Sequence, residues 1–400
     1  MKNVLISSCL ILAILTSCSN DDDSINLVDQ VEAPITYQFT RNGSSTVNFE
    51  GQTTRIQMAQ ELNVALMDNS KSATELQNMF AHVQNENDFS ELNLNSSDKS
   101  IRSKVAASKD YFSANTTVSN SIKSTMDGWI TYQANLVFVN WEITAIPGSA
   151  GQLQQSGGGS IRYVNAKGLE LNQAFAKTLI GGLMADQMLN NYLSTSILDE
   201  GSNIENNNNN VVEEGMPYTT MEHKWDEAYG YLYGNEDNPD VPVLGADSFL
   251  NTYLNQVDED EDFTGTASAV YDAFKLGRAA IVAKNYEVRD AQVQIIRENI
   301  SKVIAVRAVH YLQAGKSRLA ENDMASAFHQ LSEGFGFINS LQFTRKPNTD
   351  VPYFSHEEVN SFLTELMEDN GFWDVSVETL DIISEEIAAR FGFTVEAAAD

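Results

Sequence analysis

Apolar residues recur at helical spacing through most of this chain. Between residues 164 and 198 the large apolar side chains fall four to six positions apart, as expected for a helix with one buried face. Similar patterns run over 55–67, 119–140, 267–284 and 289–314. The sequence therefore predicts a mainly helical protein.

Two segments near the start alternate apolar and polar residues instead. Residues 36–40 and 45–49 flank Asn42-Gly43, which predicts a β-hairpin with these two residues at the turn. The segment Pro147–Ser160 is rich in Gly, Ser and Gln, and we expect it to be loop. Gly181-Gly182, inside a long apolar stretch, predicts close helix packing or a break.

One local pattern occurs twice. His223–Tyr231 and His329–Phe337 both read His-x-x-x-Glu, then a small residue, an aromatic, Gly and an aromatic. Ala174-Phe175 and Ala273-Phe274 lie about 50 residues before each copy. We therefore expect an all-α fold of two pseudo-repeated, four-helix-type bundles, with a small N-terminal β-hairpin.

Each copy places an imidazole and a carboxylate on one helix face. A pseudo-twofold arrangement would bring both pairs to one metal ion, such as Fe, Zn or Ca. In one alternative, each glutamate orients its own histidine by a hydrogen bond. In another, the histidine and glutamate only satisfy each other's hydrogen bonds where two helices pack, with the aromatics and glycine filling the contact. The candidate ligands are His223, Asp226, Glu227, His329 and Glu333.

Three cations on mostly apolar helices are candidate partners of Glu227 or Glu333. They are Lys177, Arg278 and Lys284. An ion pair of this kind would hold the helices together without any metal.

Residues 1–17 resemble a bacterial lipoprotein signal. A positive start and a short apolar run lead to Leu15-Thr-Ser-Cys18, and the run is too short to span a membrane. We expect cleavage before Cys18, lipid on its thiol, and an acidic flexible tether over 18–34. Because Cys9 leaves with the signal, the mature chain has no disulfide and no thiolate ligand.

The chain is strongly acidic, with 25 Lys and Arg against 55 Asp and Glu and a net charge of −30. This charge excludes nucleic acid as a partner and leaves the lipid as the only membrane contact. Asp258–Asp262 and Gly234–Asp240 are rich in oxygen donors for calcium. The first of these lacks the Gly and Glu of an EF-hand, with Phe263 and Ala269 at those positions, and solvated loops explain both segments.

His356–Asn360 is similar to a zinc-peptidase motif but ends in Asn where the second His is needed. Ser355 and Glu358 form a capping-box pattern, which explains the acidic residues as a helix start. We also expect Thr219 or Thr220 to be the N-cap of the helix that carries His223.

Met221–Asp226 is similar to the Gly-x-His-x-x-Glu signature of imelysin-like proteins, with Met in place of Gly and Asp in place of Glu. That resemblance implies a duplicated helical-bundle lipoprotein or periplasmic protein, encoded with iron and haem uptake systems and once classed as a peptidase. The whole mature chain resembles an uncharacterised Bacteroidota lipoprotein family, most specifically over Glu222–Gly234. The acidic residues after Cys18 resemble the surface-export signal of that group.

The expected organisation is a signal (1–17), a tether (18–34), a hairpin with a first helical half (35–215) and a second helical half (216–400). The expected function is non-enzymatic binding of iron, haem or another metal for uptake, with an outer-membrane transporter as partner. The expected location is the outer membrane, on the cell surface or alternatively facing the periplasm.

Two other functions stay open at this point. One is a metallopeptidase in which His223 binds the metal and Glu227 is the base. The other is a glycan- or protein-binding accessory of an outer-membrane transporter that uses Trp129, Tyr132 and Trp141.

Overall fold

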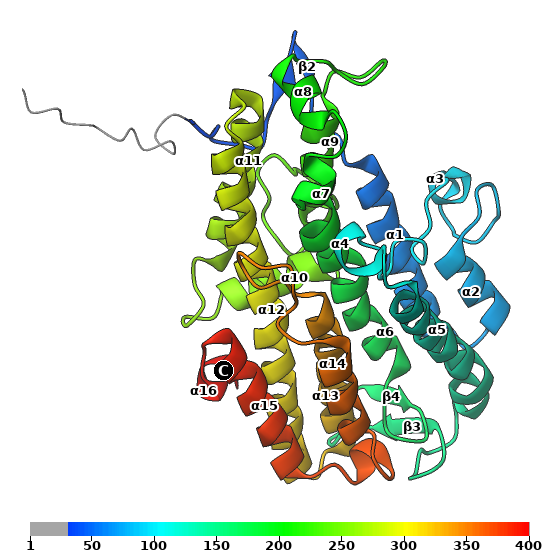
Figure 1. The fold of residues 1–400 in the computed structure, drawn as a ribbon. Coiled ribbons are helices and arrows are strands. Elements are labelled where there is room, and N and C mark those ends of the chain that lie inside the picture. Colours follow the sequence, from blue (N-terminus) through cyan, green and yellow to red (C-terminus); the bar gives the residue numbers. More distant parts are fainter. Residues whose placement is uncertain (1–30, 400) are drawn as a thin grey trace, which may run out of the picture.

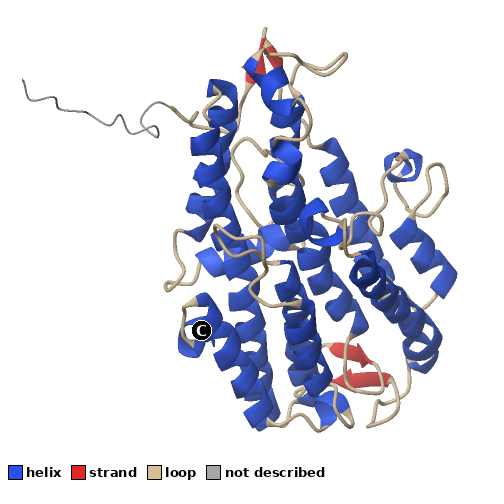
Figure 2. Ribbon diagram, viewed as in Figure 1, coloured by secondary structure: helices blue, strands red, loops and turns tan. Residues whose placement is uncertain are grey.

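A computed structural model describes residues 31–399, so the expected signal, Cys18 and most of the tether lie outside the described residues. Helices make up most of the structure (Figures 1 and 2), as the sequence predicts. The α-helices are α1 Glu50–Ala65, α2 Ala73–Ala81, α3 Leu92–Ser96, α4 Lys109–Phe112, α5 Thr116–Tyr132, α6 Leu171–Leu179, α7 Thr195–Leu198, α8 Asn203–Asn208, α9 Thr220–Tyr233, α10 Leu250–Asp258, α11 Thr266–Ala283, α12 Tyr286–Ala320, α13 Met324–Ser340, α14 His356–Leu366, α15 Val377–Phe391 and α16 Val395–Ala399.

Short π-helical and 3-10 turns extend several of these helices. The π-helical segments are η2 Gln133–Val137, η4 Ile180–Ala185 and η5 Met188–Tyr192, and the 3-10 segments are η3 Phe138–Asn140, η6 Leu341–Phe343 and η7 Gly371–Trp373. Because η4 and η5 follow α6 closely, these three segments form one long rod. Between residues 31 and 399, no helix has the length and apolar character needed to span a bilayer.

The predicted N-terminal hairpin is present but short. Strands β1 Thr40–Arg41 and β2 Ser44–Ser45 pair antiparallel. Asn42 and Gly43 both have positive φ, 52° and 82°, as a two-residue turn of this hand requires. The turn was therefore predicted correctly, although the strands are shorter than the alternating pattern suggested.

A second hairpin lies where the sequence predicted loop. Strands β3 Gly151–Gln154 and β4 Ile161–Val164 pair antiparallel, so the prediction for Pro147–Ser160 was wrong for its middle part. The hairpin is held from outside, because the Tyr163 ring stacks on Trp141 with centroids 3.3 Å apart. A polar segment pairs here because a neighbouring aromatic supplies the packing that its own sequence lacks.

Several predicted helix starts and packing features are confirmed. Thr219 caps α9 and Ser355 caps α14, each in a full capping box with the glutamate three residues later. At Gly181 an added Cβ would lie 2.5 Å from the Cβ of Ser340, and the residue sits in π-helical η4. Gly181 therefore combines close packing with a local change of helix type.

The helices of the two halves interleave. Motif helix α9, from residues 216–400, packs against α1 and η5 of the first half and also against α11. Motif helix α13 packs against α6 of the first half and against α12. One hydrophobic cluster contains residues from both halves, so 35–215 and 216–400 share a single core.

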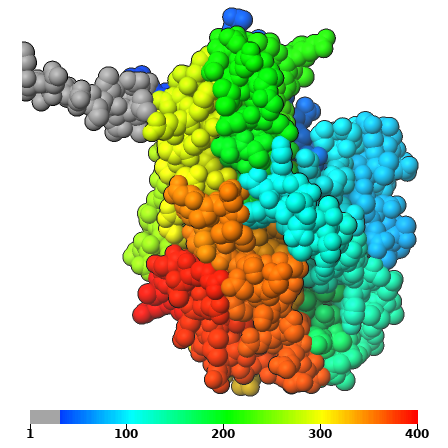
Figure 3. Space-filling model, viewed as in Figure 1, coloured from blue at the N-terminus to red at the C-terminus, as the bar shows by residue number. Residues whose placement is uncertain are grey.

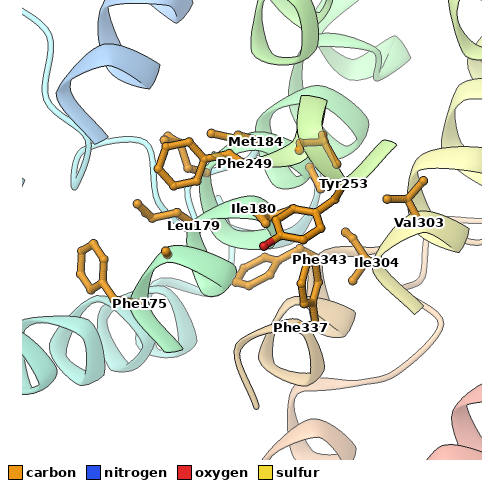
Figure 4. Packing of buried hydrophobic residues seen from close by; sticks show 14 of the residues in the cluster. Phe175, Leu179, Ile180, Met184, Phe249, Tyr253, Val303, Ile304, Phe337 and Phe343 are labelled. Carbon is orange, nitrogen blue, oxygen red and sulfur yellow. The ribbon is translucent and has the colours of Figure 1, made fainter. Parts of the chain in front are cut away.

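Part of that core lies where the α6 rod packs against α13. Figure 4 shows Ile180 of the α6 rod beside Tyr253 of α10, with Phe337 of α13 close to both. These side chains are almost completely buried. They come from both halves, so burial of apolar surface between the halves stabilises the fold.

Glycine allows α13 to approach α6 closely. A Cβ at Gly336 would lie 2.5 Å from the Cβ of Lys177 and 2.9 Å from the carbonyl oxygen of Ala174. Gly128 in α5 is also helical, but an added Cβ there would meet nothing within 4 Å.

We expect Gly336→Ala to destabilise the protein by about 1–3 kcal/mol, because the new methyl group forces the two helices apart. Gly128→Ala is the matched control, and the better helix propensity of alanine should stabilise it by up to about 1 kcal/mol. Urea unfolding followed by circular dichroism measures both. Equal effects of the two substitutions would contradict close packing at Gly336.

Candidate functional site

The two motif histidines lie at opposite ends of the molecule. His223 Nδ1 is 3.2 Å from the carbonyl oxygen of Asn48, which follows β2. His329 Nδ1 is 2.9 Å from Glu170 Oε2, just before α6 and close to β4. Figure 1 places β2 and β4 at opposite ends, so the motifs do not form a joint site.

The second motif forms an ion network between helices. The carboxylate of Glu170 faces one nitrogen of the His329 ring, and Glu333 Oε2 lies 3.8 Å from the other. Lys177 Nζ lies 2.9 Å from Glu333 Oε1, as one of the predicted pairings proposed. Burial opposes ionisation of Glu333, but Lys177 and His329 keep its pKa below the usual value. This network joins α13 to α6, and its donors do not converge on one point.

Asp226 belongs to a buried cluster centred on Arg278. Arg278 Nε lies 2.9 Å from Asp226 Oδ1, and its Nη1 lies 3.2 Å from Glu222 Oε1. The Tyr37 hydroxyl donates to Asp226 at 2.7 Å, and Arg41 binds the far side of Glu222 at 2.9 Å. Arg278 therefore pairs with these two carboxylates, and neither Glu227 nor Glu333 is its partner.

This cluster makes Asp226 unsuitable as a ligand. The residue is completely buried. Burial raises the pKa of Asp226 to about 6 against the opposing charge of Arg278. For Glu222 burial also opposes ionisation, but Arg278 and Arg41 hold its pKa below the usual value. The cluster ties the N-terminal segment, α9 and α11 together.

The side chains predicted to bind a metal are not arranged as a metal site. Across residues 31–399, no group of three or more His, Cys, Asp or Glu side chains is arranged to hold a metal ion. His223 meets a backbone carbonyl and stacks on Tyr218 with centroids 4.6 Å apart. Glu227 accepts from Gln52 at 3.1 Å and pairs with Lys224 at 2.7 Å. These contacts satisfy each side chain separately.

A cleft of about 770 Å³ opens beside the first motif helix. Of the predicted site residues, His223 and Glu227 line it, whereas Asp226, His329 and Glu333 do not. Its walls come from the start of α1, residues 97–104, the end of η5 and α9. Figure 3 shows the cyan chain around residue 100 against the green chain around residue 200. The lining residues are Asn48, Glu50, Gly51, Gln52, Thr54, Arg55, Ser97, Asp98, Lys99, Lys104, Asn191, Tyr192, Ile197, Glu200, Met216, Tyr218, His223, Lys224 and Glu227.

Most charges in this cleft already have partners. Lys99 Nζ lies 2.7 Å from Asp98, and Lys224 Nζ lies 2.7 Å from Glu227. Arg55 donates to the carbonyl oxygens of Ser100 and Gly51, at 3.2 Å each. These three cations therefore already have partners within the protein.

Lys104 is different. In the described part of the chain, no carboxylate lies within the 4.0 Å ion-pair distance of its ammonium. Its Nζ lies 5.6 Å from the Tyr192 ring centroid, and Lys224 lies equally far from the same ring. Burial lowers the pKa of Lys104 and the positive charge of Arg55 lowers it further, although the more distant carboxylate of Glu227 opposes this shift. Sequence analysis missed this lysine because a missing carboxylate partner leaves no local pattern in the sequence.

Residues 34–394 match a family described only as a domain of unknown function, DUF4856. The chain belongs to this family. No curated protein and no solved structure matches the chain. For this DUF4856 protein, the case for function therefore rests on the geometry of its sites.

We expect Arg278→Met to destabilise the protein by about 3–5 kcal/mol at pH 7, because it leaves Asp226 buried without a countercharge and Glu222 with Arg41 alone. Without Arg278 the Asp226 carboxyl holds its proton to a higher pH, so the penalty should grow as the pH rises above about 6 and level off below it, where Asp226 is protonated in both proteins. Urea unfolding between pH 5 and 8 measures this.

The control is Arg318→Met, which breaks an exposed pair with Glu321 and should cost less than about 1 kcal/mol. A small, pH-independent loss in Arg278→Met would show that the cluster does not hold the fold together.

Proposed function

We propose that this protein is a lipid-anchored, extracytoplasmic binding protein that captures a small acidic molecule in the cleft beside α9. The observation that carries the proposal is Lys104, a partly buried ammonium with no carboxylate partner in a cleft where the other cations are satisfied. A carboxylate or phosphate of the ligand would supply the missing partner.

The surroundings of Lys104 favour an anion. Arg55, Lys99 and Lys224 lie near enough for their charges to lower its pKa. Asp98 and Glu227 offset the charges of Lys99 and Lys224, so the positive charge left in the cleft is that of Lys104 and Arg55, which is bound only to carbonyl oxygens. This charge stabilises an anion, and the partly buried site weakens the screening by solvent. The net charge of −30 opposes an acidic ligand at long range, so the local cations must supply the attraction. The Tyr192 ring is almost completely buried and lies beside the ammonium in the wall of the cleft.

This proposal changes how iron or another metal would bind. The cleft has no convergent ligand set, so a metal would enter as an anionic chelate held through its organic acid. The largely polar lining suits such a chelate better than haem, whose porphyrin needs an apolar slot. A peptidase is not favoured, because His223 and Glu227 do not share a metal-binding arrangement with another histidine.

We expect at least one acidic molecule to bind wild-type protein in calorimetry with citrate, ferric citrate, glucose 6-phosphate and haemin. Lys104→Met should weaken this binding at least about tenfold, or about 1.4 kcal/mol, because the ligand loses its countercharge. Binding should also weaken as the pH rises. The loss should begin below the ordinary pKa of lysine, because the lowered pKa of Lys104 makes it lose its proton at a lower pH.

The matched control is Lys123→Met, another partly buried lysine with a lowered pKa that does not line the cleft. It should bind like wild type. The proposal fails if no acid binds, or if both lysine substitutions have the same effect.

The membrane anchor has its own test. Cys18→Ser should abolish incorporation of labelled palmitate and move the protein from the membrane to the soluble fraction. The physical reason is that lipid on Cys18 would be the only membrane contact proposed for the chain. Membrane association that survives the substitution would contradict this part of the proposal.

A further inference from the structure

A second cavity lies between α5 and α14 and shares no residue with the cleft beside α9. Figure 3 shows the orange surface of α14 next to the cyan-to-green surface of α5. The cavity measures about 450 Å³, which is within the usual range for small-ligand sites. Trp129 of α5 is half-buried in its wall, and its ring meets Phe335 of α13 edge to face with centroids 6.1 Å apart.

The lining of this cavity is nearly uncharged. It contains no Asp or Glu, although the chain has 55 of them. Its one cation is Lys167, whose Nζ donates to the carbonyl oxygen of Met367 at 2.5 Å. The remaining polar side chains are amides, hydroxyls and the His356 ring. A charged ligand would find no unbound group of opposite charge here. A neutral polar ligand would lose little solvation free energy on entering, because polar side chains replace its water.

A directed chain of hydrogen bonds runs along one wall. Asn339 donates to Thr178 at 3.1 Å, and Gln342 donates to Asn339 Oδ1 at 2.7 Å. The remaining oxygen of Gln342 accepts from His356 Nδ1 at 2.7 Å. Nε2 of the same ring accepts from the Asn360 amide at 2.9 Å. The chain therefore assigns a direction to every donor along it.

This chain fixes the state of His356. Its Nδ1 must carry the proton because Gln342 presents an oxygen, and its Nε2 must be unprotonated because Asn360 presents its amide N–H. The ring is therefore neutral, and burial lowers the pKa of His356, which favours the same state. Asn360 is exposed, and its Oδ1 ends the chain as an acceptor. The wall is thus pre-organised before any ligand arrives.

We propose that this cavity binds a neutral sugar unit, with one face of the sugar ring against Trp129 and its hydroxyls on the amide wall. The C–H groups of a sugar face suit an indole, which combines a large apolar surface with a polar edge. Both nitrogens of the His356 ring are already bound, so its role is to orient Asn360. Sugar hydroxyls donate and accept, and they match Asn360 Oδ1 and the hydroxyls in the same lining. The one cation in the lining, Lys167, already donates to the carbonyl oxygen of Met367, so a neutral sugar suits the cavity better than an acidic one.

The test uses the purified lipid-free protein on an array of neutral and acidic glycans. The methyl glycosides of glucose, galactose, mannose and N-acetylglucosamine are then titrated by tryptophan fluorescence. We expect a neutral glycan to bind. Trp129→Ala and Asn360→Ala should each weaken it at least fivefold. Asn360 is exposed, so its substitution keeps the fold even if loss of the indole does not.

Trp141→Ala is the matched control, because that indole stacks on Tyr163 outside the cavity and should leave binding unchanged. Lys104→Met should also leave it unchanged, which separates this site from the acidic-ligand cleft. The proposal is overturned if no neutral glycan binds, if only acidic glycans bind, or if binding survives both Trp129→Ala and Asn360→Ala.

Discussion

The close approach of each motif helix to a helix carrying the Ala-Phe pattern is the constraint on which the rest of the structure depends. At one seam the Trp225 ring fills the space that a side chain at Gly277 would occupy, and Arg278 binds Asp226. At the other, Gly336 leaves room for Lys177, and Lys177 binds Glu333. Both seams combine a glycine contact with a buried ion pair. Such a pair costs desolvation energy, so it adds specificity of pairing more than net stability.

This arrangement explains why the repeated motif yields little chemistry. Lys224 binds Glu227 of the first copy and buried Lys177 binds Glu333 of the second, while buried Arg278 binds Asp226 beside the first. The two histidines lie at opposite ends of the molecule. What remains accessible is different in the two copies. His223 and Glu227 border a cleft that holds the unpaired Lys104, whereas Phe335 of the second copy lies against a nearly uncharged cavity. The duplication thus sets the framework, and the loops and flanking helices around each copy decide what it binds.

The sequence predicted those features that depend on local spacing. The helices, the caps at Thr219 and Ser355, the Asn42-Gly43 turn and the close contact at Gly181 all follow from short-range rules. It did not predict which helices would meet, because periodicity identifies a buried face but not the partner of that face. The β3–β4 hairpin was missed for the same reason, since its support comes from Trp141, outside the strands.

The same limit explains the candidate site. Three of the five predicted residues bind cations or backbone groups that tertiary packing brings close. Asp226 was taken for a ligand because spacing along the chain does not reveal its ion pair with Arg278. Lys104 had no sequence signal at all, since its significance lies in a missing partner.

A calorimetric titration with zinc or ferrous ion tests the central claim, that the two motifs hold the fold and share no metal. The account predicts no stoichiometric binding that depends on both histidines. Tight one-to-one binding lost in both His223→Ala and His329→Ala would contradict it.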